Sequence, residues 1–164
     1  MDARIEQVVL DALDATGVAY EVMPCDPDLA DTAAFCEHYG VAPGESANTI
    51  IVASRGEPVQ RVACVLLATT RLDVNGIVRR RMGARKVSFA DPGDTAARTA
   101  MVLGGVTAFG LPPEYPVWVD ARVLEAESVV VGGGSRSMKV RVSPEVFRHV
   151  PGAEIVSDLA TRPD

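Results

Sequence analysis

Apolar residues recur at helical spacing in several stretches of the chain. In the first stretch, Ile5, Val9 and Leu13 fall on one face, with Gly17 just beyond, and this pattern predicts an amphipathic helix. Other stretches combine the same spacing with a capping residue before them or a glycine after them. Together these patterns predict helices at residues 3–16, 31–40, 74–82, 94–103 and 143–150.

Runs rich in β-branched residues predict the strands. The runs NTIIVAS (48–54) and RVACVLLA (61–68) flank the turn SRGEP, which predicts a hairpin. Because both runs are continuously apolar, we expect a central sheet that is covered on both faces. A glycine turn after residues 128–134 predicts a second hairpin with residues 138–143. Further strands are predicted at residues 18–23, 86–90, 116–120 and 153–159.

This order of elements predicts an α/β (α+β) fold with a central mixed, largely antiparallel sheet flanked by helices. The chain of 164 residues is 48% apolar, which fits a single compact domain over residues 1–164. No apolar run approaches the roughly 18 residues of a membrane span. The acidic start lacks the basic and apolar regions of a secretion signal, so we expect a cytoplasmic protein.

Charge is unevenly distributed along the chain. Lys and Arg number 16 against 22 Asp and Glu, a net charge of −6, which argues against a protein that coats nucleic acid. Residues 71–90 nevertheless hold six basic side chains and one acidic one. They form either a solvated helix face or a basic surface for a polyanion that is held briefly. We take Arg71, Arg79 and Arg81 as candidates for phosphate contacts.

The common catalytic signatures are missing from the sequence. It contains no GxSxG, HExxH, Walker A or GxGxxG motif. The three cysteines form no CxxC pair, and the two histidines, His38 and His149, are far apart. This is poor material for a metal site, so we expect neither a metal nor another cofactor.

Two glycine-rich segments are the most distinctive feature of the chain. They are GGVTAFG (104–110) and GGGSRS (132–137). Glycines let the backbone approach a ligand closely and present bare N–H and C=O groups to it. The alternative interpretation is a pair of tight turns. The pattern by itself indicates a small α/β domain with a glycine-lined pocket.

Five segments, in order, resemble the YbaK/prolyl-tRNA-synthetase-associated editing domain family of free-standing aminoacyl-tRNA deacylases. They are the first helix with GVAYEV, TAAFCEHYGVAPGESANTIIV, TTRLDVNGIVRRRMGARKVSFADP, GGVTAFGLPPEYPVWVD and VVVGGGSRSMKVRVSPEVF. The resemblance spans Ile5 to Leu159. It implies a mixed-sheet fold and the metal-free hydrolysis of the ester between a wrong, small amino acid and the 3′-terminal adenosine of tRNA. In such a mechanism, backbone groups and the substrate's own ribose hydroxyl position the water.

Two positions depart from the family pattern. The family's lysine falls on Asn48, whose amide can orient an ester or a ribose but cannot neutralise a phosphate. The proline of the family's glycine loop falls on Ala108, which relaxes the backbone there. From the second glycine segment, Lys139 or Arg136 can reach the pocket. Asp120 matches a strand-end aspartate of the family, and its alternative role is to cap the following turn.

These considerations give a set of candidate site residues and three readings of the function. The catalytic candidates are Asn48, Gly104, Gly105, Thr107 and Asp120. The substrate-binding candidates are Arg71, Val106, Ala108, Gly132, Gly133, Gly134 and Ser135. The leading hypothesis is trans-editing of mischarged tRNA, with the tRNA acceptor end as partner. The alternatives are a catalytically impaired binding module for an aminoacyl or nucleotide ligand, and an interaction domain whose acidic N-terminal half docks an aminoacyl-tRNA synthetase.

Overall fold

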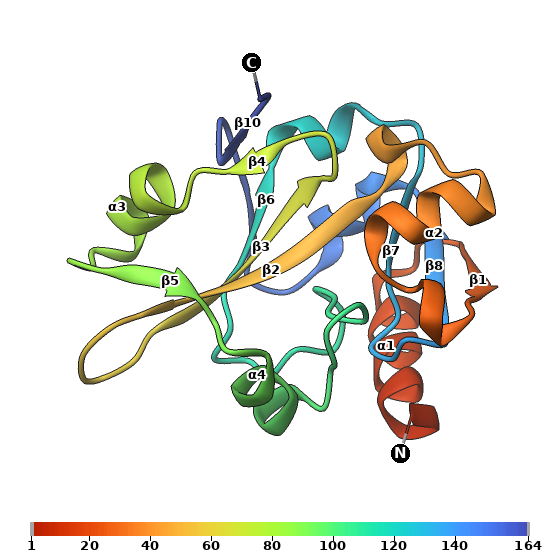
Figure 1. Cartoon of the computed structure of the whole chain (residues 1–164), viewed down its shortest axis with the longest axis horizontal. Coiled ribbons are helices and arrows are strands. Elements are labelled where there is room, and N and C mark those ends of the chain that lie inside the picture. The colour runs from red at the N-terminus through yellow and green to blue at the C-terminus, as the bar shows by residue number, and fades with distance from the viewer. Residues whose placement is uncertain (1, 164) are drawn as a thin grey trace.

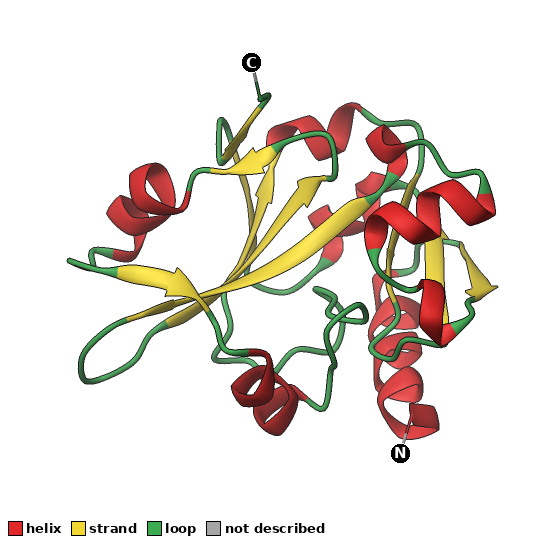
Figure 2. Ribbon diagram, viewed as in Figure 1, coloured by secondary structure: helices red, strands yellow, loops and turns green. Residues whose placement is uncertain are grey.

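The computed structural model describes residues 2–163 and contains a central sheet, a smaller second sheet and a two-stranded ribbon (Figures 1 and 2). The α-helices are α1 (Asp2–Thr16), α2 (Thr32–Tyr39), α3 (Arg79–Met82) and α4 (Pro92–Thr99). The strands are β1 (Tyr20–Pro24), β2 (Ala47–Ser54), β3 (Arg61–Leu67), β4 (Arg71–Leu72), β5 (Val87–Phe89), β6 (Val117–Asp120), β7 (Val129–Gly132), β8 (Met138–Val142), β9 (Ala153–Val156) and β10 (Ala160–Thr161).

The central sheet is mixed, as predicted. Its strand order is β5-β2-β3-β6-β9. Strands β2 and β3 form the expected antiparallel hairpin, and β5 adds to β2 in the antiparallel sense. Strand β6 runs parallel to both β3 and β9. The start of β2 and the end of β3 therefore lie together at one end of the sheet, where the candidate site is found.

The hairpin predicted on either side of the second glycine segment forms, but its strands belong to a second sheet. Strands β7 and β8 pair antiparallel, and β1 adds to β8 to give the order β1-β8-β7. An isolated parallel bridge between Ser46 and Val130 joins β7 to the beginning of β2. The two sheets thus meet at the start of β2, and a cavity can form where they diverge.

Most predicted helices are confirmed, with different boundaries. Helix α2 ends at Gly40, whose left-handed backbone (φ 68°) lets its N–H donate to Cys36 O. The helix predicted at 94–103 ends at Thr99, because Ala100 turns left-handed (φ 63°) and Met101 then enters the core. The segment predicted at 143–150 is a 3₁₀ helix, Pro144–His149. Within residues 2–163, no helix is long and apolar enough to cross a membrane.

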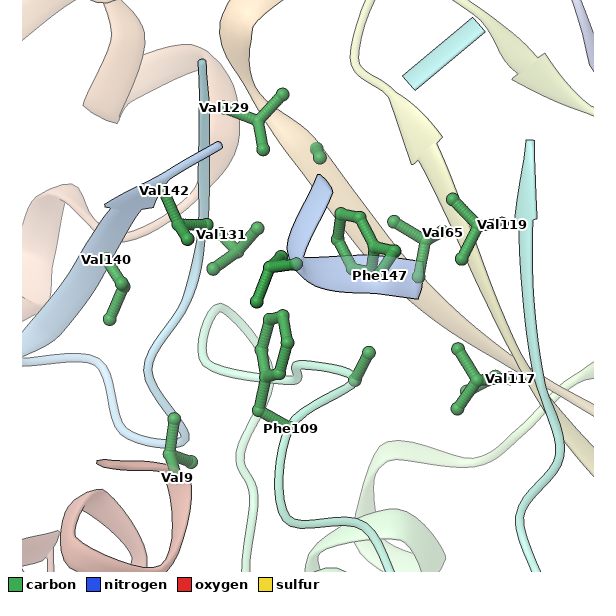
Figure 3. Packing of buried hydrophobic residues seen from close by; sticks show 14 of the residues in the cluster. Val9, Val65, Phe109, Val117, Val119, Val129, Val131, Val140, Val142 and Phe147 are labelled. Carbon is green, nitrogen blue, oxygen red and sulfur yellow. The ribbon is translucent and has the colours of Figure 1, made fainter. Parts of the chain in front are cut away.

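Apolar side chains cover the central sheet on both faces, as its continuously apolar strands predict. On one face, Val9 of α1 packs in a cluster with Val65 and Val119 (Figure 3). In the same cluster, the rings of Phe109 and Phe147 stack with centroids 5.5 Å apart. A second cluster, around Val52 and Trp118 among others, covers the opposite face. Phe109 belongs to the first glycine segment, so its burial anchors that segment against the core.

Candidate active site

A cavity of about 220 Å³ opens between the two sheets. The N-terminal part of β2 and strand β7 form two walls, and the N-terminus of α2 and the first glycine segment form the others. The lining residues are Ala30, Asp31, Thr32, Phe35, Ser46, Ala47, Asn48, Thr49, Ile50, Leu103, Gly104, Val106, Val130, Val131, Gly132 and Lys139. Four of the predicted site residues therefore meet here: Asn48, Gly104, Val106 and Gly132.

The two glycine segments pack directly against each other beside the cavity. The N–H of Gly134 donates to Gly105 O at 2.7 Å. A Cβ atom on Gly105 would lie 2.6 Å from Ser135 O, and one on Gly132 would lie 2.5 Å from Val106 O. Neither backbone oxygen can yield as a flexible side chain would, so both positions require glycine. The glycines thus bring the two segments together as well as forming part of the cavity wall.

Lys139 carries a buried positive charge into the cavity. The residue is only 8% exposed, and its Nζ donates to Gly104 O at 2.7 Å. Nζ also lies 5.5 Å from the centroid of the Phe35 ring. No carboxylate in the described part of the chain forms an ion pair with Lys139. Because burial disfavours the ammonium form, the pKa of Lys139 is lowered.

Asn48 lines the same cavity as Lys139. Its Oδ1 accepts a hydrogen bond from Thr32 Oγ1 at 2.9 Å. This contact ties β2 to the first turn of α2 and fixes the orientation of the amide. The amide nitrogen makes no hydrogen bond to any residue in the range 2–163. An amide held in this way has N–H donors available for a ligand.

Arg136 connects residues at the edge of the cavity by hydrogen bonds. Its Nε donates to Pro27 O at 2.8 Å, and its Nη1 donates to Leu103 O at 2.9 Å. Nη1 also pairs with Asp31 Oδ1 at 3.1 Å. One side chain of the second glycine segment thus links the approach to α2 with the first glycine segment. A Cβ on Gly104 would lie 2.5 Å from that guanidinium, so the fit is close.

Three predicted residues are buried outside the cavity. Thr107 and Ala108 point into the interior, and the Thr107 hydroxyl has no hydrogen-bond partner among the described residues. Asp120 is fully buried at the end of β6. Its side chain does not cap the following turn, and its Oδ1 accepts instead from Ala160 N at 3.2 Å. Burial raises the pKa of Asp120, and the hydrogen bond from Ala160 and the charge of Arg122 oppose that shift.

The rest of the second glycine segment supports the cavity without lining it. A Cβ on Gly134 would press on Ile5 of α1, at 2.9 Å. Gly133 packs in the same way against Met138 O, at 2.6 Å from an added Cβ. The Ser135 hydroxyl donates to the Glu6 carboxylate of α1. Gly134 and Ser135 thus hold the segment against α1, and Gly133 holds it against β8, so their role in this structure is to position Gly132.

The arginines predicted to meet phosphates lie away from the cavity. Arg71 is exposed on β4, and Arg79 is on α3. Arg81 pairs with Glu154 at 2.5 Å, and its guanidinium carbon lies 4.7 Å from the centroid of the Trp118 ring. Arg81 is therefore engaged within the protein.

The sequence prediction gave no central place to Lys139, Phe35, Thr32 or Leu103, although all four line the cavity. In β8, Lys139 and Arg141 alternate with apolar residues. Because this is the ordinary pattern of a half-buried strand, the sequence did not distinguish Lys139. The contributions of α2 and Leu103 depend on tertiary packing that spacing does not encode.

Comparison with known proteins agrees with this architecture. Residues 26–150 match the family described as "Aminoacyl-tRNA editing domain". The chain belongs to the aminoacyl-tRNA editing domain family. The matched region includes the start of β2, both glycine segments and Lys139, so every wall of the cavity lies within it. The resemblance drawn from the sequence motifs is thereby confirmed.

Individual relatives are distant in sequence and close in fold. The "Putative Cys-tRNA(Pro)/Cys-tRNA(Cys) deacylase EbsC" of Enterococcus faecalis is 22% identical over 111 residues, which span 68% of this chain and 66% of that protein. The crystal structure of "hypothetical protein APE2540" superposes with a TM-score of 0.80 at 25% identity, covering 93% of this chain and 98% of that one. A "putative trans-editing enzyme for prolyl tRNA synthetase" also gives 0.80, at 19% identity, covering 97% and 98%.

Proposed function

We propose that this protein hydrolyses the ester that joins a small amino acid to the 3′-terminal adenosine of tRNA. One observation carries the proposal. A single cavity brings together the Lys139 ammonium group, the Asn48 amide and the backbone of two glycines. The chain also belongs to the aminoacyl-tRNA editing domain family. The curated relative that is named as a Cys-tRNA deacylase supports the same chemistry.

The size of the cavity favours a small aminoacyl group. Pockets for drug-sized ligands enclose about 300–1,000 Å³, whereas this cavity encloses about 220 Å³. The side chains of Val106, Val130 and Ile50 narrow it. We therefore expect it to accept amino acids such as alanine, cysteine or serine. A single methylene in such a pocket is worth only about 1–3 kcal/mol of discrimination, so selectivity among them has to be measured.

The groups in the cavity can perform ester hydrolysis by positioning and electrostatics. A water oxygen attacks the ester carbonyl carbon, and negative charge develops on the carbonyl oxygen. In our proposal, Lys139 Nζ donates to that oxygen and stabilises the charge, as donors in an oxyanion hole do. The carbon–oxygen bond to the ribose then breaks, the ribose oxygen takes up the proton of the water, and the free amino acid leaves.

Asn48 would orient the ester for this attack. Its Oδ1 is engaged by Thr32, so the amide nitrogen is the group available to the substrate. We assign it a hydrogen bond to the ribose hydroxyl next to the ester. That hydroxyl would in turn hold the attacking water, and holding a reactant in place can supply a large share of the rate acceleration.

Phosphates of the tRNA would meet basic residues outside the cavity. Because Arg81 is engaged with Glu154 and Trp118, we favour the exposed side chains of Arg80, Arg85 and Lys86 for this role. Such contacts weaken steeply as salt increases. The overall charge of −6 fits a tRNA end that is bound briefly and released.

A deacylation assay tests the proposal. The purified protein is incubated with tRNAs charged with alanine, cysteine, serine, threonine or proline, in parallel with Asn48→Ala and Asn48→Lys. We expect the wild type to release at least one amino acid and Asn48→Ala to release it more slowly. If the wild type hydrolyses none of the five esters, the proposal is wrong.

A second candidate is a binding module that has lost the reaction. The observation in its favour is Asn48 itself, which stands where the resemblance implies a lysine. This alternative predicts an inactive wild type and activity in Asn48→Lys. The position of Lys139 in the same cavity argues for the hydrolase, because a positive charge is still supplied from β8.

A further inference from the structure

A second cavity lies at the end of the central sheet that is remote from α2 and the candidate active site (Figure 1). It encloses about 380 Å³ and shares no lining residue with the active-site cavity. On the β2–β3 ladder, Asn48 of the active site pairs with Leu66, whereas Arg61 of the second cavity is the first residue of β3. At about 3.3 Å per residue, these two positions on β3 are about 17 Å apart. The second cavity is therefore a separate feature of the molecule.

Three arginines line this cavity, and one carboxylate holds two of them. Arg61 Nε donates to Asp94 Oδ2 at 3.1 Å, and Arg98 Nε donates to Asp94 Oδ1 at 2.9 Å. The two guanidinium groups are therefore close to each other and oriented by the same partner. Within residues 2–163, their terminal Nη atoms make no hydrogen bond. Two forks of N–H donors are thus available to a ligand.

A buried hydroxyl without a partner lies near these guanidinium groups. Tyr115 also lines the cavity and is only 5% exposed, and its hydroxyl has no hydrogen-bond partner among residues 2–163. Burial raises the pKa of Tyr115, and the positive charges of Arg61 and Arg98 oppose that shift. Buried polar groups normally have a partner. An oxyanion held by the two arginines would supply the acceptor that this hydroxyl lacks.

The other walls leave room for a group attached to the anion. Trp118 provides an apolar wall, and the guanidinium carbon of Arg81 lies 4.7 Å from the centroid of its ring. Arg81 also pairs with Glu154, which offsets its charge. The exposed side chain of Glu114 lines the cavity too and opposes the binding of an anion. Because the volume falls within the range of about 300–1,000 Å³ that small-molecule pockets have, the anion can be part of a larger molecule.

We propose that this cavity binds a terminal phosphate monoester. One arginine fork is enough for both oxygens of a carboxylate. Two adjacent forks and a hydroxyl match a phosphate monoester better, because it has three terminal oxygens and a charge of about −1.5 to −2 at neutral pH. An internal phosphodiester of RNA has fewer free oxygens and a smaller charge. The same monoester occurs on free nucleotides and at the 5′ end of tRNA, and the experiments below distinguish these two sources.

Titration calorimetry with inorganic phosphate and with AMP, at constant ionic strength, tests the site directly. Both ligands should bind the wild type. Arg98→Gln and Tyr115→Phe should each weaken binding about 10- to 150-fold, the effect of one lost hydrogen bond to a charged group. Because Tyr115→Phe removes a hydroxyl that has no partner in the fold, it should not destabilise the protein, and its loss of binding cannot come from unfolding.

Two further variants separate this site from the general charge of the protein. Arg148→Gln removes a cation that pairs through Nε with Glu145 outside the cavity, and it should bind phosphate as the wild type does. Glu114→Gln removes the opposing carboxylate and should tighten binding by up to about 5-fold. The inference is overturned if the wild type binds neither phosphate nor AMP, or if Arg98→Gln and Tyr115→Phe bind them normally. Equal weakening in Arg148→Gln and Arg98→Gln would overturn it as well.

A pair of tRNAs identifies the source of the phosphate. Uncharged tRNA with its 5′ phosphate and the same tRNA after dephosphorylation are compared by filter binding. A wild-type preference for the phosphorylated tRNA that Arg98→Gln abolishes would assign the site to the 5′ end of tRNA. Equal binding of the two tRNAs, with AMP bound at the site, would assign it to a free nucleotide. None of these measurements involves ester hydrolysis, so failure of this inference and failure of the proposed function are distinguishable.

Discussion

Replacement of Lys139 by methionine separates the chemistry of the site from the stability of the fold. Methionine keeps most of the volume of the lysine side chain and removes the ammonium. If Nζ stabilises the developing oxyanion, Lys139→Met should lower kcat about 10²- to 10³-fold, the usual effect of removing one such donor. The protein should nevertheless stay folded, because the energetic contributions of the ammonium to stability oppose one another.

The contacts of Lys139 allow that balance to be worked out. The variant loses a charge-assisted hydrogen bond to Gly104 O, worth about 1.5–3 kcal/mol. It also loses the interaction with the Phe35 ring, worth about 0.5–2 kcal/mol. Against these stands the desolvation of a buried ammonium that has no carboxylate partner, a cost of several kcal/mol. We expect the free energy of unfolding to change by no more than about 2 kcal/mol, or roughly 4–8 °C in Tm.

The assay is steady-state deacylation of the preferred aminoacyl-tRNA, with thermal unfolding of the same samples followed by circular dichroism. Arg141→Met is the matched control, because Arg141 is a second cation on β8 that pairs with Glu45 outside the cavity. The control should retain the wild-type kcat. Wild-type kcat in folded Lys139→Met would refute the role of the ammonium.

Three further predictions follow from the same structure. Burial lowers the pKa of Lys139. After the uncatalysed rate is subtracted, the enzyme-catalysed rate should therefore fall as pH rises and the ammonium loses its proton, at a lower pH than for an ordinary lysine. Over the interval between the folded and the unfolded pKa, the unfolded chain binds more protons, so the Lys139 contribution to stability should rise with pH and be absent in Lys139→Met. Gly105→Ala should lower the free energy of unfolding by about 1–3 kcal/mol through overlap with backbone. In urea titrations, Gly44→Ala, whose added Cβ has an ordinary contact at 4.0 Å, should match the wild type. Asp120→Asn should leave kcat and KM unchanged. Because burial raises the pKa of Asp120, the wild type should gain stability relative to this variant as pH falls through that pKa. Acid titrations that show no such gain would contradict the raised pKa of Asp120.

The elements of this fold were predictable where local pattern and tertiary packing agree. Helix α1, the β2–β3 hairpin and the glycine stop of α2 follow from apolar periodicity and turn chemistry in short windows. The division into two sheets was missed, because β7 and β8 show the same apolar alternation whichever sheet they join. The end of α4 was missed because Met101 is drawn into the core, a tertiary effect that overrides a continuing helical pattern.

The site was predictable to the extent that backbone requirements are visible in sequence. Glycine-rich segments indicate where the backbone comes close to another group, and Gly104 and Gly132 line the cavity. Thr107 and Asp120 were placed in the site by their positions in motifs, but each side chain points into the interior, a direction that spacing does not fix. The central place of Lys139 in the cavity was not predicted, because it depends on strand pairing and not on a local motif. Its position on β8 is ordinary in sequence, and only the pairing with Gly132 and Met23 brings it to the cavity.

The interlocked glycines constrain how this site can diversify. Gly105, beside the cavity, and Gly132, in its wall, are pressed against backbone oxygens, so substitution at either position cannot proceed without moving the main chain. The remaining adjustable surface consists of the side chains that enter from the strands and the first glycine segment, namely Ile50, Val106 and Val130. Homologues with different amino-acid preferences should therefore vary at these three positions and keep the glycines, so that selectivity drifts while the scaffold of the reaction is inherited intact.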